Sequence, residues 1–145
     1  GPWSEQAQDA AQRLQAEGYQ VVRTLMDRAS FIAKMDMRAR ILHNPERRCC
    51  TGIVQFGKGT SGPPGRVHGG ALFSGVDYIL AFLANRSQGC LVFTAHQNIN
   101  YRRAVELDST GHWRPPSAGY CSPHVSKLDF GGGNLMTLSN DFAIV

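Results

Sequence analysis

The sequence lacks the patterns that identify several common kinds of site. Its four cysteines form no Cys-x-x-Cys pair, and none of its five histidines has the spacing of a metal ligand set. A Gly-x-Ser-x-Gly nucleophile motif is missing as well. We therefore expect no disulfide framework, no metal site and no serine-hydrolase elbow. This cysteine usage favours a reducing compartment, the cytoplasm or the mitochondrion.

Long hydrophobic runs and long runs of one charge are also missing. The main apolar stretch, residues 71–84, is too short to span a membrane and contains Asp77. The net charge of +4 comes from short basic clusters, so it favours anionic partners only weakly, and we expect no nucleic-acid partner. The opening Gly1-Pro2 is typical of a remnant left when a protease removes a tag, so the natural N-terminus is expected to be missing.

The length of 145 residues and the apolar content of 42% predict one globular domain. Hydrophobic periodicity predicts an α+β fold in which an antiparallel sheet wraps around one central helix. The expected elements are an exposed helix over 5–17, partly helical structure over 20–34, a hairpin over 36–56, a buried helix over 69–84, a strand over 91–105 and a hairpin over 125–145. We expect an N-terminal helical segment over 1–35 and the domain itself over 36–145.

The most informative segment is Gly-Pro-Pro-Gly-Arg-Val-His-Gly-Gly at residues 62–70, directly before the apolar helix. Gly69 and Gly70 let a ligand approach the backbone, and the free N–H groups of a helix N-terminus suit a developing oxyanion. A plain glycine-rich turn is the alternative. For His68 alone, a hydrogen-bonded structural role is favoured over acid–base work.

Asp77 is the only charge in the first four turns of that helix. A carboxylate in an apolar helix needs a partner or a function, and capping of buried donors is the alternative to catalysis. Asp77 follows Gly70 by seven residues, about two turns or roughly 10 Å along the axis, too far to act on a group held at Gly70. A second, antiparallel copy of the helix would bring its Asp77 to the first helix's N-terminus, which predicts a dimer with two shared sites.

The strand over 91–105 is long, so a bend or bulge is expected in it. Strict alternation predicts a polar face made of Thr94, His96, Asn98, Asn100 and Arg102. That face lines a groove or is an ordinary solvated face. Arg102 and Arg103 point to opposite sides of a strand, so one of them at most serves a given phosphate.

These residues together resemble the hotdog-fold acyl-CoA thioesterases of the phenylacetate-pathway type, including the eukaryotic thioesterase superfamily members. The resemblance is carried by residues 62–70, by Asp77 nine residues after His68, and by Thr-Ala-His-Gln-Asn-Ile-Asn-Tyr-Arg-Arg at 94–103. It covers residues 36–108 well and 125–145 more loosely.

The resemblance implies a sheet of five or six strands around a long helix, and a homodimer whose sheets join, often as a dimer of dimers. It implies a role in lipid metabolism, hydrolysis of a fatty or aryl acyl-CoA, and no cofactor beyond the coenzyme A of the substrate. The catalytic group it implies consists of the Gly70 N–H for the thioester carbonyl, Asp77 of the facing subunit as general base or nucleophile, Thr94 to orient water, and His68 for positioning. The substrate-binding residues that we predict are Gly69 at the helix entrance, Asn98 and Asn100 on the strand face, and Arg102 and Arg103 as candidates for the coenzyme A phosphates, without a firm position in the family.

One segment departs from that family. Residues 109–124 contain three prolines and two glycines where a long regular strand is expected, so we predict irregular structure there. A local shift of the coding sequence is one explanation, and a real irregular excursion is the other. The departure keeps open a catalytically silent module that binds acyl-CoA or a protein partner.

Overall fold

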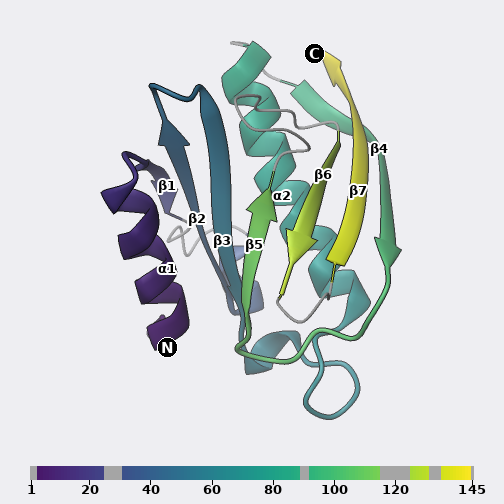
Figure 1. Ribbon diagram of the computed structural model, residues 1–145. Coiled ribbons are helices and arrows are strands. Elements are labelled where there is room, and N and C mark those ends of the chain that lie inside the picture. Colours follow the sequence, from purple (N-terminus) through teal and green to yellow (C-terminus); the bar gives the residue numbers. More distant parts are fainter. Residues whose placement is uncertain (1–2, 25–30, 89–91, 115–124, 131–134, 145) are drawn as a thin grey trace.

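The computed structural model describes residues 3–24, 31–88, 92–114, 125–130 and 135–144 (Figure 1). These residues form two α-helices and seven strands, with short 3-10 turns at Ala33–Met35 and Lys58–Thr60. The elements are α1 (Glu5–Ala16), β1 (Gln20–Thr24), β2 (Met37–Asn44), β3 (Cys49–Phe56), α2 (Gly69–Gln88), β4 (Val92–Tyr101), β5 (Thr110–Arg114), β6 (Val125–Asp129) and β7 (Leu135–Ile144). All pairings are antiparallel, in the order β1-β2-β3-β5-β6-β7-β4. The resemblance implied five or six strands, and the described sheet has seven.

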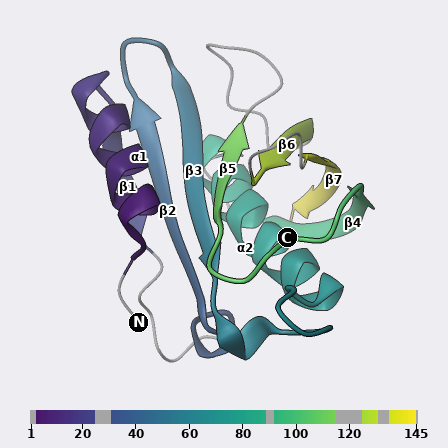
Figure 2. The ribbon, with the colours of Figure 1, turned by 60° about the horizontal axis from the view of Figure 1, so that its bottom comes forward.

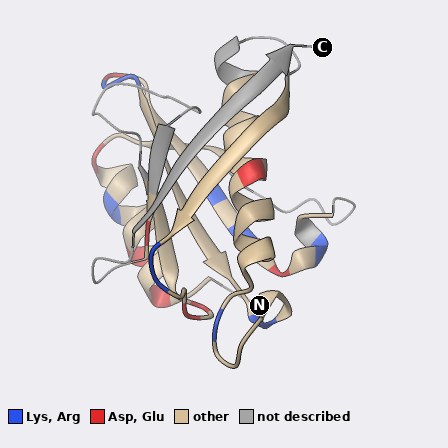
Figure 3. Ribbon diagram, turned by 90° about the vertical axis from the view of Figure 1, so that its right-hand side faces the viewer, with Lys and Arg blue, Asp and Glu red and all other residues tan. Residues whose placement is uncertain are grey.

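The long helix α2 lies against one face of this curved sheet (Figures 1 and 2). Its apolar side chains pack with those of β2 and β3 in the main core. Figure 3 shows that α2 is nearly free of charged residues, as a helix enclosed by a sheet must be. The predicted central helix is therefore confirmed, and it continues to Gln88. No helix in the described part of the chain is long and apolar enough to cross a membrane.

The N-terminal helix α1 covers the other face of the sheet (Figure 2). Ser4 caps it, because the Ser4 hydroxyl accepts a hydrogen bond from the Ala7 N–H at 3.2 Å. Gly18 ends it in a left-handed conformation, with φ of 98°. The helix is not simply exposed, as its polar sequence suggested. A stripe of small residues is buried on Leu42 and Ile53, namely Ala7, Ala10 and Ala11.

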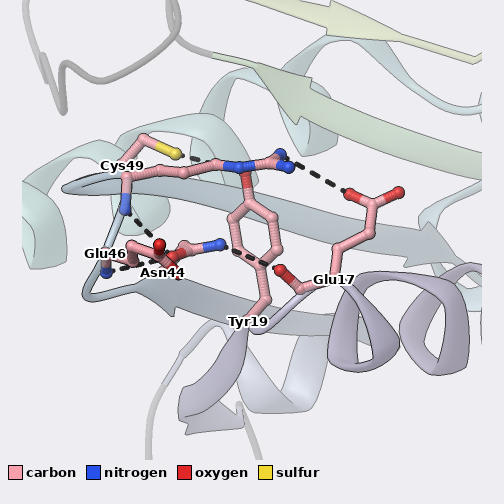
Figure 4. A network of polar contacts seen from close by, with 6 residues as sticks. Glu17, Tyr19, Asn44, Glu46 and Cys49 are labelled. Atoms are coloured by element: carbon pink, nitrogen blue, oxygen red, sulfur yellow. Dashed lines mark hydrogen bonds and ion pairs between the residues drawn. The ribbon is translucent and has the colours of Figure 1, made fainter.

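The expected hairpin over 36–56 is present as β2 and β3, paired without a register shift. Asn44 organises its turn from a buried position (Figure 4). The Asn44 Oδ1 accepts hydrogen bonds from the Glu46 and Arg47 N–H groups, at 3.1 and 3.0 Å, and its Nδ2 donates to the Glu17 carbonyl at 3.2 Å. One amide therefore joins the hairpin turn to the end of α1.

Asn44→Ala is expected to lower the free energy of unfolding by about 2 kcal/mol, because three backbone groups lose their partner. Asn44→Asp should lose less, since a carboxylate still accepts from the turn but cannot donate to Glu17. Urea titration followed by circular dichroism measures both. Glu46→Ala, at an exposed neighbouring position, is the control and should change stability by under about 0.5 kcal/mol. An Asn44→Ala variant as stable as this control would contradict the assignment.

The segment over 20–34 differs from its expected partly helical form. Gln20–Thr24 form β1, which pairs with β2, and only Ala33–Met35 make a short 3-10 turn. Val21 and Val22 are β-branched residues, and the edge of β2 gives them a strand to pair with. The sheet thus begins before residue 36. The division of the chain into 1–35 and 36–145 stays a prediction.

The segment over 109–124 also differs from expectation where it is described. Thr110–Arg114 form β5, which lies between β3 and β6 inside the sheet, whereas residues 115–124 lie outside the described residues. The prolines that argued against a strand begin only at Pro115. Gly111 suits the position, because a Cβ there would lie 2.6 Å from the Phe130 ring and 2.9 Å from a Val54 methyl.

Candidate active site

The start of α2 is held by backbone hydrogen bonds around His68. The His68 N–H donates to the Thr60 carbonyl at 2.7 Å, and the His68 carbonyl accepts from the N–H groups of Ala71 and Leu72 at 3.0 and 3.1 Å. The Pro-Pro segment before it is an exposed loop, whereas Val67 is buried. His68, Gly69 and Gly70 therefore lie at the surface, and the hydrogen bonds of the His68 backbone fix the start of the helix.

The His68 ring itself closes over that entrance. The Gly70 N–H donates to His68 Nδ1 at 2.9 Å, so the predicted oxyanion donor has an internal partner in the free chain. A Cβ at Gly70 would lie 3.0 Å from Nδ1, so a larger residue there would push the His68 ring back by a few tenths of an ångström. His68, Gly69 and Gly70 are all exposed. A ligand carbonyl can reach the Gly70 N–H by taking the place of the imidazole.

Asp77 has a specific partner on the neighbouring strand. The Thr94 hydroxyl donates to Asp77 Oδ1 at 2.6 Å, a length typical of a hydrogen bond to a charged carboxylate. Both side chains are half-buried, so the pair is shielded in part but still open to solvent. The structure thus brings together two of the predicted catalytic residues from α2 and β4.

A bulge in β4 decides which side chains face α2. The β4–β7 register shifts between Thr94 and His96, as the length of the strand predicted. After the shift, Gln97, Ile99 and Tyr101 face α2 or the core, whereas the alternate positions are exposed.

The prediction that Thr94 shares a face with His96, Asn98 and Asn100 is therefore wrong. One extra residue reverses the alternation, and Thr94 turns to Asp77 while the others turn away from α2. Asn98 and Asn100, predicted to bind substrate, are exposed on the side of β4 that α2 does not cover.

A cavity of about 420 Å³ lies beside the start of α2. Three arginines line it, Arg66, Arg102 and Arg103, together with Gly69 and Tyr101. Arg66 has one weak ion pair, with Glu106 at 3.8 Å, and both side chains are well exposed. Predicted residues Gly69, Arg102 and Arg103 are thus brought together with a positive charge that suits phosphate groups. The expectation that Arg102 and Arg103 point to opposite sides of a strand is wrong, because β4 ends at Tyr101 and both arginines line the same cavity.

Three residues of this region were missed from the sequence. Arg66 lies within the quoted 62–70 segment and was passed over, although it is adjacent to the helix entrance. Gln97 and Tyr101 face α2 only because of the bulge, and no sequence signal fixes the position of a bulge. Burial raises the pKa of the Tyr101 phenol above its ordinary value near 10, so its hydroxyl remains a donor at neutral pH.

Within one chain, Asp77 and Gly70 remain about two helical turns apart, as their spacing requires. Among the described residues, no group of three or more His, Cys, Asp or Glu side chains is able to hold a metal ion. The polar groups therefore form two half-sites along α2. One is the anion-binding entrance at residues 68–70, and the other is the carboxylate with its threonine.

A long central helix enclosed by one curved antiparallel sheet, with the entrance loop before the helix, defines the hotdog fold. The sequence agrees with this class, since a sequence model of the thioesterase superfamily matches residues 64–111. This match confirms the resemblance to the hotdog thioesterases across the segment that holds Gly70, Asp77 and Thr94.

Solved structures share the fold at low sequence identity. Thioesterase superfamily member 2 from zebrafish has a TM-score of 0.52 at 13% identity, covering 79% of this chain and 88% of its own. A hypothetical thioesterase from Streptococcus pneumoniae TIGR4, solved with coenzyme A, has a TM-score of 0.51 at 17% identity, covering 89% and 90%. The E. coli PaaI protein from the phenylacetic acid degradation operon has a TM-score of 0.50 at 13% identity, covering 99% and 96%.

Proposed function

We propose that the protein is an acyl-CoA thioesterase that hydrolyses a fatty or aryl acyl-CoA to the free acid and coenzyme A. The observation that carries this proposal is the 2.6 Å hydrogen bond from Thr94 to Asp77, on the same helix that opens with the His-Gly-Gly entrance. A carboxylate paired with a hydroxyl activates or orients water, and a helix N-terminus stabilises the oxyanion that forms when water attacks a carbonyl. The superfamily match over residues 64–111 supports the same chemistry.

The active site is completed in a homodimer. The thioester carbonyl accepts the Gly70 N–H of one subunit in place of His68, and Asp77 of the partner subunit acts on water or on the carbonyl carbon. The thiolate of coenzyme A then leaves and takes up a proton, and the acid is released. Asp77 as base or as nucleophile gives the same products.

The end of the sheet supports dimerisation. β4 is the last strand of the described sheet, so one of its backbone edges is available to a second copy. Large apolar side chains are exposed on it and on the adjacent helix: Phe93 is 55% exposed, Tyr101 46% and Phe73 41%. Pairing of two β4 strands would cover such a surface and join the sheets.

The cavity at Arg66, Arg102 and Arg103 is proposed to hold the phosphates of coenzyme A. It adjoins Gly69 and therefore lies next to the carbonyl site. A structure related in fold was solved with coenzyme A, which supports this choice of ligand class.

The test is a panel of short, long and aryl acyl-CoA thioesters with free thiol as the readout. The proposal expects thiol release with at least one member of the panel and a dimer in sedimentation analysis. Binding of acyl-CoA without thiol release would instead identify the catalytically silent module. That alternative has lost part of its basis, because β5 is a regular strand at 110–114.

Thr94→Val is expected to lower kcat about 10- to 100-fold, because it removes the donor to Asp77 while nearly preserving shape. Thr94→Ser keeps the hydroxyl and should retain most of the activity. Steady-state kinetics on the best substrate of the panel measures both variants. Equal kcat values for the valine and serine variants would show that the hydroxyl has no part in turnover.

A further inference from the structure

Three side chains of β4 form a ladder of hydrogen bonds along one side of α2. Thr94 donates to the Asp77 carboxylate at 2.6 Å, Gln97 Nε2 donates to the Phe73 carbonyl at 2.9 Å, and the Tyr101 hydroxyl donates to the Gly69 carbonyl at 3.0 Å. The acceptors on α2 follow one another at intervals of four residues, so they lie along one face of the helix. The donors follow in the reverse order along β4.

The hydrogen bond from Tyr101 reaches the peptide group that carries the proposed oxyanion donor. The Gly69 carbonyl and the Gly70 N–H belong to the same peptide group, which is planar. A hydrogen bond to the carbonyl therefore fixes the direction of the N–H. It also draws electron density from the amide, which makes the N–H a stronger donor.

The hydrogen bond from Gln97 reaches the helical turn that carries Asp77. In an α-helix the Phe73 carbonyl accepts the N–H of the residue four positions on, which is Asp77. A carbonyl oxygen has two lone pairs, so the Gln97 amide adds to that bond without replacing it. Gln97 thereby ties the backbone of the Asp77 turn to the strand that carries Thr94.

We propose that Tyr101 and Gln97 are positioning residues that set the two half-sites of α2 through its backbone, Tyr101 by aiming the Gly70 N–H and Gln97 by holding the Asp77 turn. This inference rests on the proposed thioesterase function. Each residue acts on a carbonyl of the helix, Gln97 on Phe73 and Tyr101 on Gly69, and Tyr101 also lines the cavity proposed for the phosphates of coenzyme A. The hydrogen bonds between β4 and α2 would therefore set the distance between the two half-sites.

The test compares Tyr101→Phe and Gln97→Glu with the wild-type enzyme. Tyr101→Phe removes only the hydroxyl, and Gln97→Glu keeps the shape but turns the donor into an acceptor. Each variant is expected to lower kcat about 10-fold while KM changes by less than about 3-fold, because a small displacement in the site affects the transition state more than binding.

Matched controls separate this effect from a general loss of stability. Tyr19→Phe removes a hydroxyl bonded to Cys49 on the other side of the molecule, and Gln12→Glu changes an exposed position of α1. Both controls are expected to keep wild-type kcat. A fall in kcat for the controls equal to that for Tyr101→Phe would overturn the proposal.

Amide hydrogen exchange provides a readout that does not depend on turnover. The proposal expects the Gly70 N–H to exchange at least about 5-fold faster in Tyr101→Phe than in wild type, and the Asp77 N–H to do so in Gln97→Glu. If the wild-type protein hydrolyses no acyl-CoA, the proposed function fails and exchange alone decides the ladder. Unchanged exchange at both amides would overturn the ladder even in an active enzyme.

Discussion

Asp77→Asn is expected to lower kcat for acyl-CoA hydrolysis at least about 1000-fold while the protein stays folded and dimeric. Asparagine has nearly the same shape, and its carbonyl oxygen still accepts the Thr94 hydroxyl. The variant loses the negative charge, and with it the ability to take a proton from water or to attack a carbonyl. A thiol-release assay beside circular dichroism and sedimentation measures the three properties together. Turnover within about 10-fold of wild type would end the proposed mechanism.

Mixed dimers test whether Asp77 acts across the interface. Gly70→Pro removes the proposed oxyanion N–H in the first helical turn, where proline is tolerated, and should be inactive alone. A dimer of one Asp77→Asn and one Gly70→Pro subunit keeps one complete site if the two groups come from different subunits. When equal amounts of the two variants are mixed and re-associate at random, half of the dimers contain one subunit of each kind, and each of these has one complete site out of two. The mixture should therefore recover about a quarter of wild-type activity.

Two controls make the mixing result decisive. Asp108→Asn changes an exposed carboxylate outside the site and should leave kcat unchanged. A chain with both Asp77→Asn and Gly70→Pro, mixed with wild type, separates dilution of subunits from complementation. If the two inactive single variants remain inactive after mixing, each site would have to take Asp77 and Gly70 from the same chain. That result would contradict the proposed site shared between two subunits, which was inferred from the two-turn separation of Gly70 and Asp77 along α2.

The central helix and the first hairpin were predictable because their patterns are long and local. Residues 69–84 are apolar on nearly every side, which predicts a helix buried inside the domain. The spacing of Gly70 and Asp77 also follows from helix geometry alone. Both features depend on residues close together in the chain, so they could be predicted from the sequence alone.

The orientation of Thr94 was not fully predictable, because it depends on a one-residue bulge. Strict alternation would have grouped Thr94 with Asn98, and a shift of one residue reverses every later side chain. β5 was missed for a related reason. Gly111 weakens a strand by its own propensity, yet the close approach of Phe130 requires a residue without a side chain. The orientation of Thr94 and the formation of β5 both depend on contacts with distant parts of the chain, and these contacts cannot be inferred from local composition.

Gly75→Val is expected to lower the free energy of unfolding by about 3 kcal/mol, because the added side chain overpacks the core between α2 and the sheet. Gly75 is buried where α2 meets β2 and β3. A Cβ there would lie 2.5 Å from the Met37 sulfur and 2.9 Å from the Phe56 ring. Phe56 is 1% exposed and has no space to move into, so overpacking outweighs the usual gain from replacing a helical glycine.

Chemical denaturation of Gly75→Val and Gly69→Ala compares two glycines of the same helix. Gly69 has no atom within 4 Å of an added Cβ, so Gly69→Ala should change stability by under about 0.5 kcal/mol. Met37→Ala in the Gly75→Val background should recover part of the loss, because it removes one of the two clashes. A Gly75→Val variant as stable as Gly69→Ala would show that the helix does not pack closely there.

The position of Gly75 connects this stability to the site. At 100° per residue, Gly75 lies about 200° from Phe73 and from Asp77, nearly opposite the ladder to β4. Close packing on one side and hydrogen bonds on the other therefore hold α2 from two directions. A substitution at Gly75 that leaves the protein folded should still lower kcat, because it pushes the helix toward β4 and displaces Asp77 from Thr94. Steady-state kinetics on Gly75→Ala, the milder variant, would measure that displacement directly.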